Sequence, residues 1–238
     1  MQLTAIVGAM VLSVATGAAP ALADQQVYIY SVNHPLYGDI GTLTDTIVRG
    51  PKTTRIDSRL RIVVKVLGIV FSRQDSDTTE IVKGNRLVSL KSVTEKDGRR
   101  LEVHGEAQGD KFVVKTTSGS FVGPATILPS DPWVLKRTGE ETVIFTDTGR
   151  ITVMRISGGD EVMIPVNGIS VSARHFIVMG DKRQEVWLDD REVPVMFRTV
   201  EDGTAIDFVL QHGSPATTET TGATLKRSAL APPGDGYK

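Results

Sequence analysis

The chain has 238 residues, of which 40% are apolar and 5% aromatic, with 27 Lys and Arg against 28 Asp and Glu. These proportions suit one ordinary globular domain. The absence of Cys excludes a disulfide framework, a thiolate metal site and a catalytic thiol. A net charge of -1 excludes the broad positive field that nucleic-acid binding requires, so we expect no nucleic-acid partner.

The N-terminal residues have the character of an export signal. Ala5 to Val14 form an apolar run too short to cross about 30 Å of hydrocarbon, and the small residues after it end in Ala21-Leu22-Ala23. This pattern predicts a signal peptide over residues 1–23 and a periplasmic or secreted protein that does not span the membrane after signal removal. The run is preceded by no Lys or Arg, so a buried N-terminal helix or a retained anchor is the alternative.

The C-terminal residues 213–238 are rich in Thr, Ser, Pro and Gly, and Leu225 and Leu230 are their large aliphatic residues. Such a stretch cannot bury enough surface to offset the entropy of ordering it. We therefore expect a disordered tail, which leaves residues 24–212 as a single β-rich domain.

Alternation with a period of two dominates this body. In Arg55–Val66, one face carries Ile56, Ser58, Leu60, Ile62, Val64 and Val66, and the other carries mostly charged residues. Similar strands are predicted at 27–32, 86–94, 111–116, 142–146, 151–156, 169–178 and 193–200.

Turn sequences separate these strands at short intervals, which is typical of antiparallel meanders. The predicted turns are Lys96-Asp97-Gly98, Gln108-Gly109-Asp110, Gly158-Gly159-Asp160, Gly180-Asp181 and Glu201-Asp202-Gly203. The only helix start is Ser130-Asp131-Pro132, which supports at most two turns through Trp133 and Leu135. We expect an all-β protein with little helix, whose meanders form a closed or half-open barrel-like sheet.

A faint internal repeat aligns 80–103 with 185–208 without a gap. Both segments read as strand, loop, strand, Asp-Gly hairpin and strand, with Asp97-Gly98 matching Asp202-Gly203. We favour two similar three-stranded meanders in one barrel, and coincidence of hairpin sequences remains the alternative.

Several segments carry a resemblance to a known family. Glu185–Asp189, Val193–Val195 and Asp202–Phe208 resemble the closing segment of a group of secreted bacterial proteins, domain-of-unknown-function family 6134. Val32–Gly41 resembles its opening strand and Ile-Gly turn, and Trp133 with Asp147–Arg150 resembles its central aromatic and Thr-Gly turn. Leu188 stands where that family more often shows Tyr. The resemblance implies an exported β-rich protein of unassigned activity, with a barrel shape like that of a related group, family 3108.

Motifs for catalysis or metal binding are missing from the sequence. It has no nucleophile elbow, no phosphate loop and no His pair at i and i+4, and its four His residues stand in separate segments. Asp75, Asp77 and Glu80 could meet a hard cation, but a solvated loop is the favoured interpretation. We predict no catalytic residue, no metal and no cofactor.

Arg59, Arg61 and Lys65 fall on one face of the Arg55–Val66 strand. This basic ladder could contact an anionic headgroup, an acidic glycan or a partner's acidic strip. The favoured alternative is a solvated outer face paired with acids such as Glu102 and Glu106.

Trp133 lies in a Pro-bounded loop, where its ring either caps the barrel mouth or lines an entry. Trp133, Arg59, Arg61 and Lys65 are thus the candidate ligand-binding residues. We expect a non-catalytic binding or structural protein of the cell envelope, with an apolar or amphiphilic ligand or an envelope partner. The alternative is a hydrolase of envelope glycans or esters that uses two facing carboxylates.

Overall fold

A computed structural model describes residues 24–84, 86–134, 137–201 and 203–214. The predicted signal peptide, Leu135, Asp202 and the tail from residue 215 lie outside the described residues. The strands are β1 (Asp24–His34), β2 (Gly38–Arg49), β3 (Thr53–Val66), β4 (Ile69–Lys83), β5 (Arg86–Lys96), β6 (Arg99–Gln108), β7 (Lys111–Thr116), β8 (Gly119–Pro124), β9 (Leu128–Pro129), β10 (Gly139–Ile144), β11 (Ile151–Val166), β12 (Ile169–Met179), β13 (Arg183–Leu188), β14 (Pro194–Glu201) and β15 (Thr204–Ser214). The last strand ends two residues beyond the predicted end of the domain at His212.

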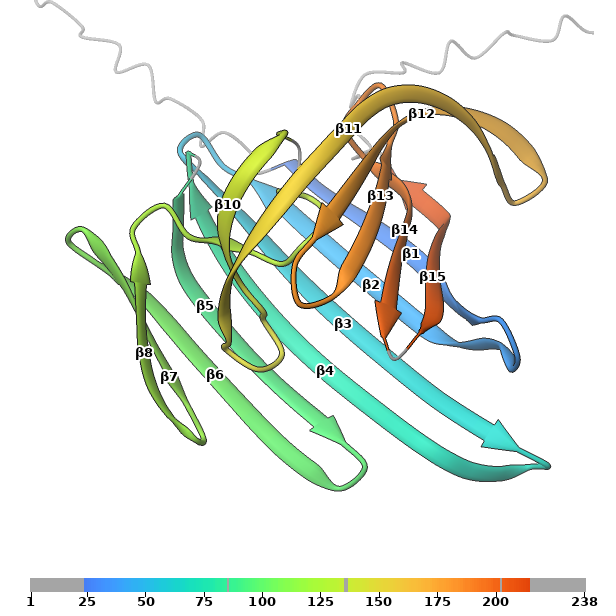
Figure 1. Ribbon diagram of the computed structural model, residues 1–238, viewed down its shortest axis with the longest axis horizontal. Helices are drawn as coiled ribbons and strands as arrows, with labels where there is room; N and C mark the ends of the chain where they lie inside the picture. The colour runs from blue at the N-terminus through green and yellow to red at the C-terminus, as the bar shows by residue number, and fades with distance from the viewer. Residues whose placement is uncertain (1–23, 85, 135–136, 202, 215–238) are drawn as a thin grey trace, which may run out of the picture.

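The 15 strands of the described residues belong to one curled sheet with the order β8-β7-β6-β5-β4-β3-β2-β1-β15-β14-β13-β12-β11-β10-β9 (Figure 1). Neighbouring strands are antiparallel, except that the short β9 runs parallel to β10. The described strands show no ladder between β8 and β9, the two ends of this order. The sheet is therefore a half-open barrel, and the all-β prediction is confirmed.

The concave face of the sheet holds the apolar core. Its main cluster joins side chains of β1 to β3 with side chains of β10 to β15, including Tyr30, Ile47, Met154 and Phe197. A second cluster packs Leu90 and Phe112 against Ile127 and Ile144, and so brings the two ends of the sheet together. Packing across the interior, and not a closing ladder, holds the barrel in shape.

The alternation in β3 places its two faces as expected over most of the strand. Ile56 is buried, and Leu60, Ile62 and Val64 pack against the main core. Val66 is the exception, because the end of β3 continues beyond β2 and pairs only with β4, which leaves this side chain 39% exposed.

Two predicted turns are wrong. Gly158 and Gly159 form a bulge inside β11, where both residues have positive φ and the register with β12 shifts. Ile40 and Gly41 lie inside β2, and the chain turns earlier, after His34. The predicted helix at Ser130 is only a single turn within the described residues.

The two segments of the proposed repeat do form similar meanders. β4, β5 and β6 are consecutive antiparallel strands, and so are β13, β14 and β15. The matched acids of the two meanders have different surroundings. Glu80 is buried, whereas Oε2 of its counterpart Glu185 lies 2.9 Å from His175 Nε2.

Candidate functional site

The segment from Leu128 to Val134 enters the interior of the barrel. It begins with β9, whose Leu128 and Pro129 lie opposite Val143 and Ile144 of β10. Pro129 has no backbone N–H to donate, and this is tolerated because β9 is an edge strand whose free side forms no ladder. The Asp131 carboxylate then accepts the backbone N–H of Trp133 at 2.7 Å, which closes the turn that aims the indole inward.

Trp133 lies inside the protein, with 5% of its surface exposed. Its ring packs on Tyr28 with a centroid distance of 4.6 Å, and its Nε1–H donates to Asp45 Oδ2 at 2.8 Å. The side chain thus bridges β1 and β2 from within. It also separates two pockets, because it lines the first and holds a carboxylate that lines the second.

The first pocket, the Trp133 pocket, has a cavity volume of about 380 Å³. Most of its lining residues are apolar, but two arginines and a carboxylate also line it, so its walls are as polar as they are apolar. The lining is Ile47, Arg49, Thr54, Ile56, Val82, Gly84, Leu87, Leu128, Pro129, Trp133, Val134, Arg137 and Glu192. The volume lies at the low end of the usual range for small-molecule sites.

The second pocket, the acidic pocket, has a cavity volume of about 260 Å³. Asp45, Glu80 and Asp131 line it together with apolar side chains such as Leu60 and Phe208. Asp45 and Glu80 are 1% and 2% exposed, and Asp45 Oδ1 and Glu80 Oε2 have no hydrogen-bond partner. Buried carboxylate oxygens without partners are costly, so this pocket is a strained place in the core.

Burial and mutual repulsion change the proton affinity of these acids. Desolvation raises the pKa of Asp45 to about 6, although the hydrogen bond from Trp133 opposes the change. Desolvation and the neighbouring charges raise the pKa of Glu80 and the pKa of Asp131 well above their ordinary values. Tyr30, whose hydroxyl is buried without a partner, has its pKa raised for the same reasons. The acidic pocket therefore holds protons at a pH where exposed carboxyl groups have lost them.

Sequence reasoning did not find this carboxylate cluster. Asp45 shares the inward face of β2 with Leu43 and Ile47, and Glu80 shares the inward face of β4 with Ser76 and Thr78. The available signal was that each carboxylate stands at a position where the alternation along the strand predicts a side chain directed into the core. It could not show that two strands and a distant turn bring three acids into one pocket.

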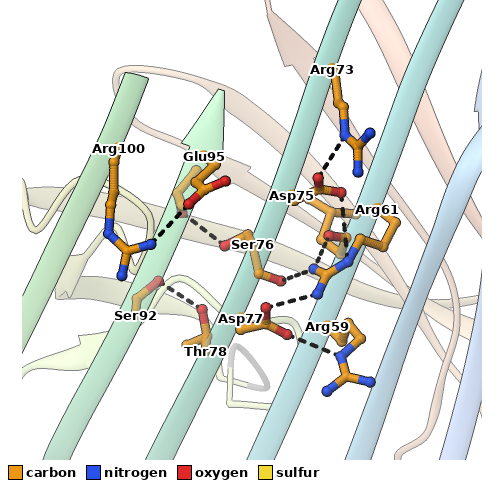
Figure 2. A network of polar contacts seen from close by, with 12 residues as sticks. Arg59, Arg61, Arg73, Asp75, Ser76, Asp77, Thr78, Ser92, Glu95 and Arg100 are labelled. Atoms are coloured by element: carbon orange, nitrogen blue, oxygen red, sulfur yellow. Dashed lines mark hydrogen bonds and ion pairs between the residues drawn. The ribbon is translucent and has the colours of Figure 1, made fainter. Parts of the chain in front are cut away.

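The basic ladder lies on the outer face of β3 (Figure 2). Arg59 Nε donates to Asp77 Oδ1 at 3.0 Å, and Arg61 Nη2 donates to Asp77 Oδ2 at 2.8 Å. Arg61 Nε also lies 3.5 Å from Asp75 Oδ1. Arg59 and Arg61 are thus paired on a solvated face, as in the favoured alternative, but their partners are on β4 and not at Glu102 or Glu106.

The predicted acidic loop is a strand. Asp75 and Asp77 point outward from β4 toward arginines, while Glu80 points into the barrel, so the three acids do not converge. Among the residues that the structure describes, no three His, Asp or Glu side chains are placed to hold a metal ion. Within the same residues no helix is long and apolar enough to cross a membrane.

Comparison with known proteins concerns the family and the fold. The model of the family described as domain of unknown function, DUF6134, matches residues 38–211. A beta-barrel-like protein of domain of unknown function DUF1849 from Brucella abortus has a similar crystal structure, with a TM-score of 0.61 and 12% identity. The match covers 82% of this chain and 99% of that chain. No curated protein matches the sequence.

Proposed function

The chain belongs to the DUF6134 family, and from that premise we propose that it is a non-catalytic binding protein of the cell envelope. Its ligand is a small anionic amphiphile that occupies the Trp133 pocket. The observation that carries this proposal is a preformed cavity of about 380 Å³ whose lining combines apolar side chains with two arginines. The signal-like residues 1–23 support export to the periplasm or the medium.

The polar groups of the pocket suggest the charge of the ligand. Arg49 donates to Gln26, and among the described residues no carboxylate lies within ion-pair distance of its guanidinium. Arg137 has a distant ion pair, 3.9 Å from Glu141. Both guanidinium groups can therefore receive a carboxylate or phosphate, while Val82, Trp133 and Val134 can contact an alkyl chain.

The proposal is tested by the fluorescence of Trp133. The chain has 2 Trp residues, so Trp187→Phe leaves Trp133 as the sole indole. We expect saturable emission changes when this variant is titrated with octanoate, decanoate or a lysophosphatidylglycerol. Arg49→Gln in the same background should weaken decanoate binding about ten-fold, which corresponds to about 1.4 kcal/mol, and should leave decanol binding unchanged.

Arg59→Gln is the matched control, because Arg59 is an arginine on the outer face of the sheet. Its decanoate affinity should equal that of the parent. A folded protein that shows no response to any of these amphiphiles would contradict the proposal, and so would equal losses in the Arg49 and Arg59 variants.

The hydrolase alternative has one specific observation in its favour, the acidic pocket. A carboxyl group that stays protonated beside one that ionises is the arrangement that glycoside hydrolysis uses. If Asp45 and Glu80 work in this way, Asp45→Asn and Glu80→Gln should each lower hydrolysis of a chromogenic glycoside or ester at least a hundred-fold. Wild-type protein that is inactive on a broad panel of such substrates removes this alternative.

A further inference from the structure

The β3–β4 hairpin ends in an exposed apolar tip. Val66, Leu67, Ile69, Val70 and Phe71 lie around its turn, and Leu67 and Phe71 are 98% and 76% exposed. Soluble proteins rarely present large apolar side chains together in this way unless they contact a partner or a membrane. The tip therefore requires a functional explanation.

The tip projects beyond both neighbouring strands, as the lower right of Figure 1 shows. On one side the β2 ladder reaches only to Ile62 of β3, and on the other side the β5 ladder reaches only to Gln74 of β4. About four residues of each strand continue as a two-stranded ribbon, which at about 3.3 Å per residue extends roughly 13 Å. A ribbon of this kind has no core of its own to bury its side chains.

Cationic side chains surround the base of this ribbon. Lys65 lies on it, and Lys96 and Arg99 flank the adjacent β5–β6 turn. No carboxylate lies within ion-pair distance of these three cations among the described residues. The Asp97 carboxylate, which the Ser72 hydroxyl and the backbone N–H of Arg73 hold in place, interacts with Lys96 and Arg99 and offsets one of the three positive charges.

A second apolar turn lies at the same end of the sheet. Leu36 and Tyr37, in the turn between β1 and β2, are both exposed, and β2 neighbours β3 in the sheet. Both turns project toward the same side in Figure 1. This end of the barrel thus presents two exposed apolar turns, and cations lie beside the β3–β4 tip.

We propose that this end of the barrel docks on an anionic lipid bilayer, with the β3–β4 tip inserted at the boundary between headgroups and acyl chains. Apolar side chains that enter this boundary, together with Lys and Arg at the level of the phosphates, are the usual features of interfacial binding. A second copy of the chain is a poorer partner, because tip-to-tip association would bring the two sets of cations together. The proposal does not depend on the ligand of the Trp133 pocket.

Docking would orient the two pockets differently. Ile62 and Gln74 of the acidic pocket lie toward the hairpin end of the strands, whereas Arg49 and Gly84 of the Trp133 pocket lie toward the opposite end. The acidic pocket would then be the nearer to the bilayer, and the Trp133 pocket would lie on the aqueous side.

The experiment is co-sedimentation of the full chain, after signal removal, with vesicles of phosphatidylglycerol and phosphatidylethanolamine. We expect binding that weakens as salt rises and that is at least ten-fold weaker for vesicles of phosphatidylcholine alone. Leu67→Asn with Phe71→Ser should reduce binding at least ten-fold; Asn suits position 67, where φ is 50°. Lys96→Gln with Arg99→Gln should reduce the dependence on salt.

Met163→Asn with Ile169→Ser is the matched control. These side chains are also exposed, at 63% and 68%, but they lie near the β11–β12 turn at the other end of the sheet. The control should bind vesicles as the wild type does. Equal loss in both double variants, no binding by wild type, or a dimer in sedimentation velocity that disappears with Leu67→Asn and Phe71→Ser would each overturn the proposal.

Discussion

Replacing Trp133 with Ala is expected to lower the free energy of unfolding by about 3–5 kcal/mol. The indole is 5% exposed and packs on Tyr28, so its loss leaves a cavity between the two pockets. The substitution also removes the donor to Asp45 Oδ2, a carboxylate whose other oxygen already lacks a partner. Urea unfolding followed by circular dichroism measures the change.

Trp133→Phe separates the two effects of that substitution. It keeps an aromatic ring against Tyr28 but loses the hydrogen bond to Asp45, so we expect a smaller loss of about 1–2 kcal/mol. Stability in Trp133→Ala within 1 kcal/mol of the wild type would show that the inward segment does not hold the barrel together.

The second large effect is a change in how stability depends on pH. Asp45 has a pKa of about 6 in the folded protein and of 3.8 when unperturbed, so the folded state binds its proton more tightly. Its contribution to stability is fully present below pH 4 and is lost as pH rises through about 6. Asp45→Asn should therefore match the wild type below pH 4 and exceed it by about 3 kcal/mol at pH 8.

The difference between the two proteins reports on the acidic pocket, because Asp45→Asn also removes a charge that helps to raise the pKa of Glu80 and the pKa of Asp131. Asp57 and Asp77 have pKa values lowered by arginines, and they destabilise both proteins equally when the pH falls below their ordinary range. Glu80→Gln should diverge from the wild type in the same direction as Asp45→Asn, because burial raises the pKa of Glu80 also. Parallel curves of stability against pH from 4 to 8 would contradict the assignment.

The arrangement of strands was largely predictable because it depends on local rules. Alternation along β3, the Asp97-Gly98 hairpin and the Gln108–Asp110 turn each involve residues close in sequence. The errors occurred where the same residue type has two uses. Gly158 and Gly159 suit a turn and a bulge equally, and only the pairing of β11 with β12 decides between them.

The basic ladder shows a related ambiguity. Alternation correctly put Arg59, Arg61 and Lys65 on one outer face, but it could not name their partners. The register of β3 with β4 places Arg59 opposite Asp77 and Arg61 opposite Asp75. Lys65 instead lies on the projecting ribbon, where no neighbouring strand supplies an acid.

By itself, the sequence determined the all-β class, the absence of thiol chemistry and the family, since composition, alternation and turn residues are local properties. The tertiary structure alone decided where Trp133 lies and which acids meet. The Trp133 indole and the Asp45 carboxylate are 88 residues apart in sequence and 2.8 Å apart in space. Only the curling of the sheet brings them together, because burial and mutual repulsion depend on distances that a sequence does not contain.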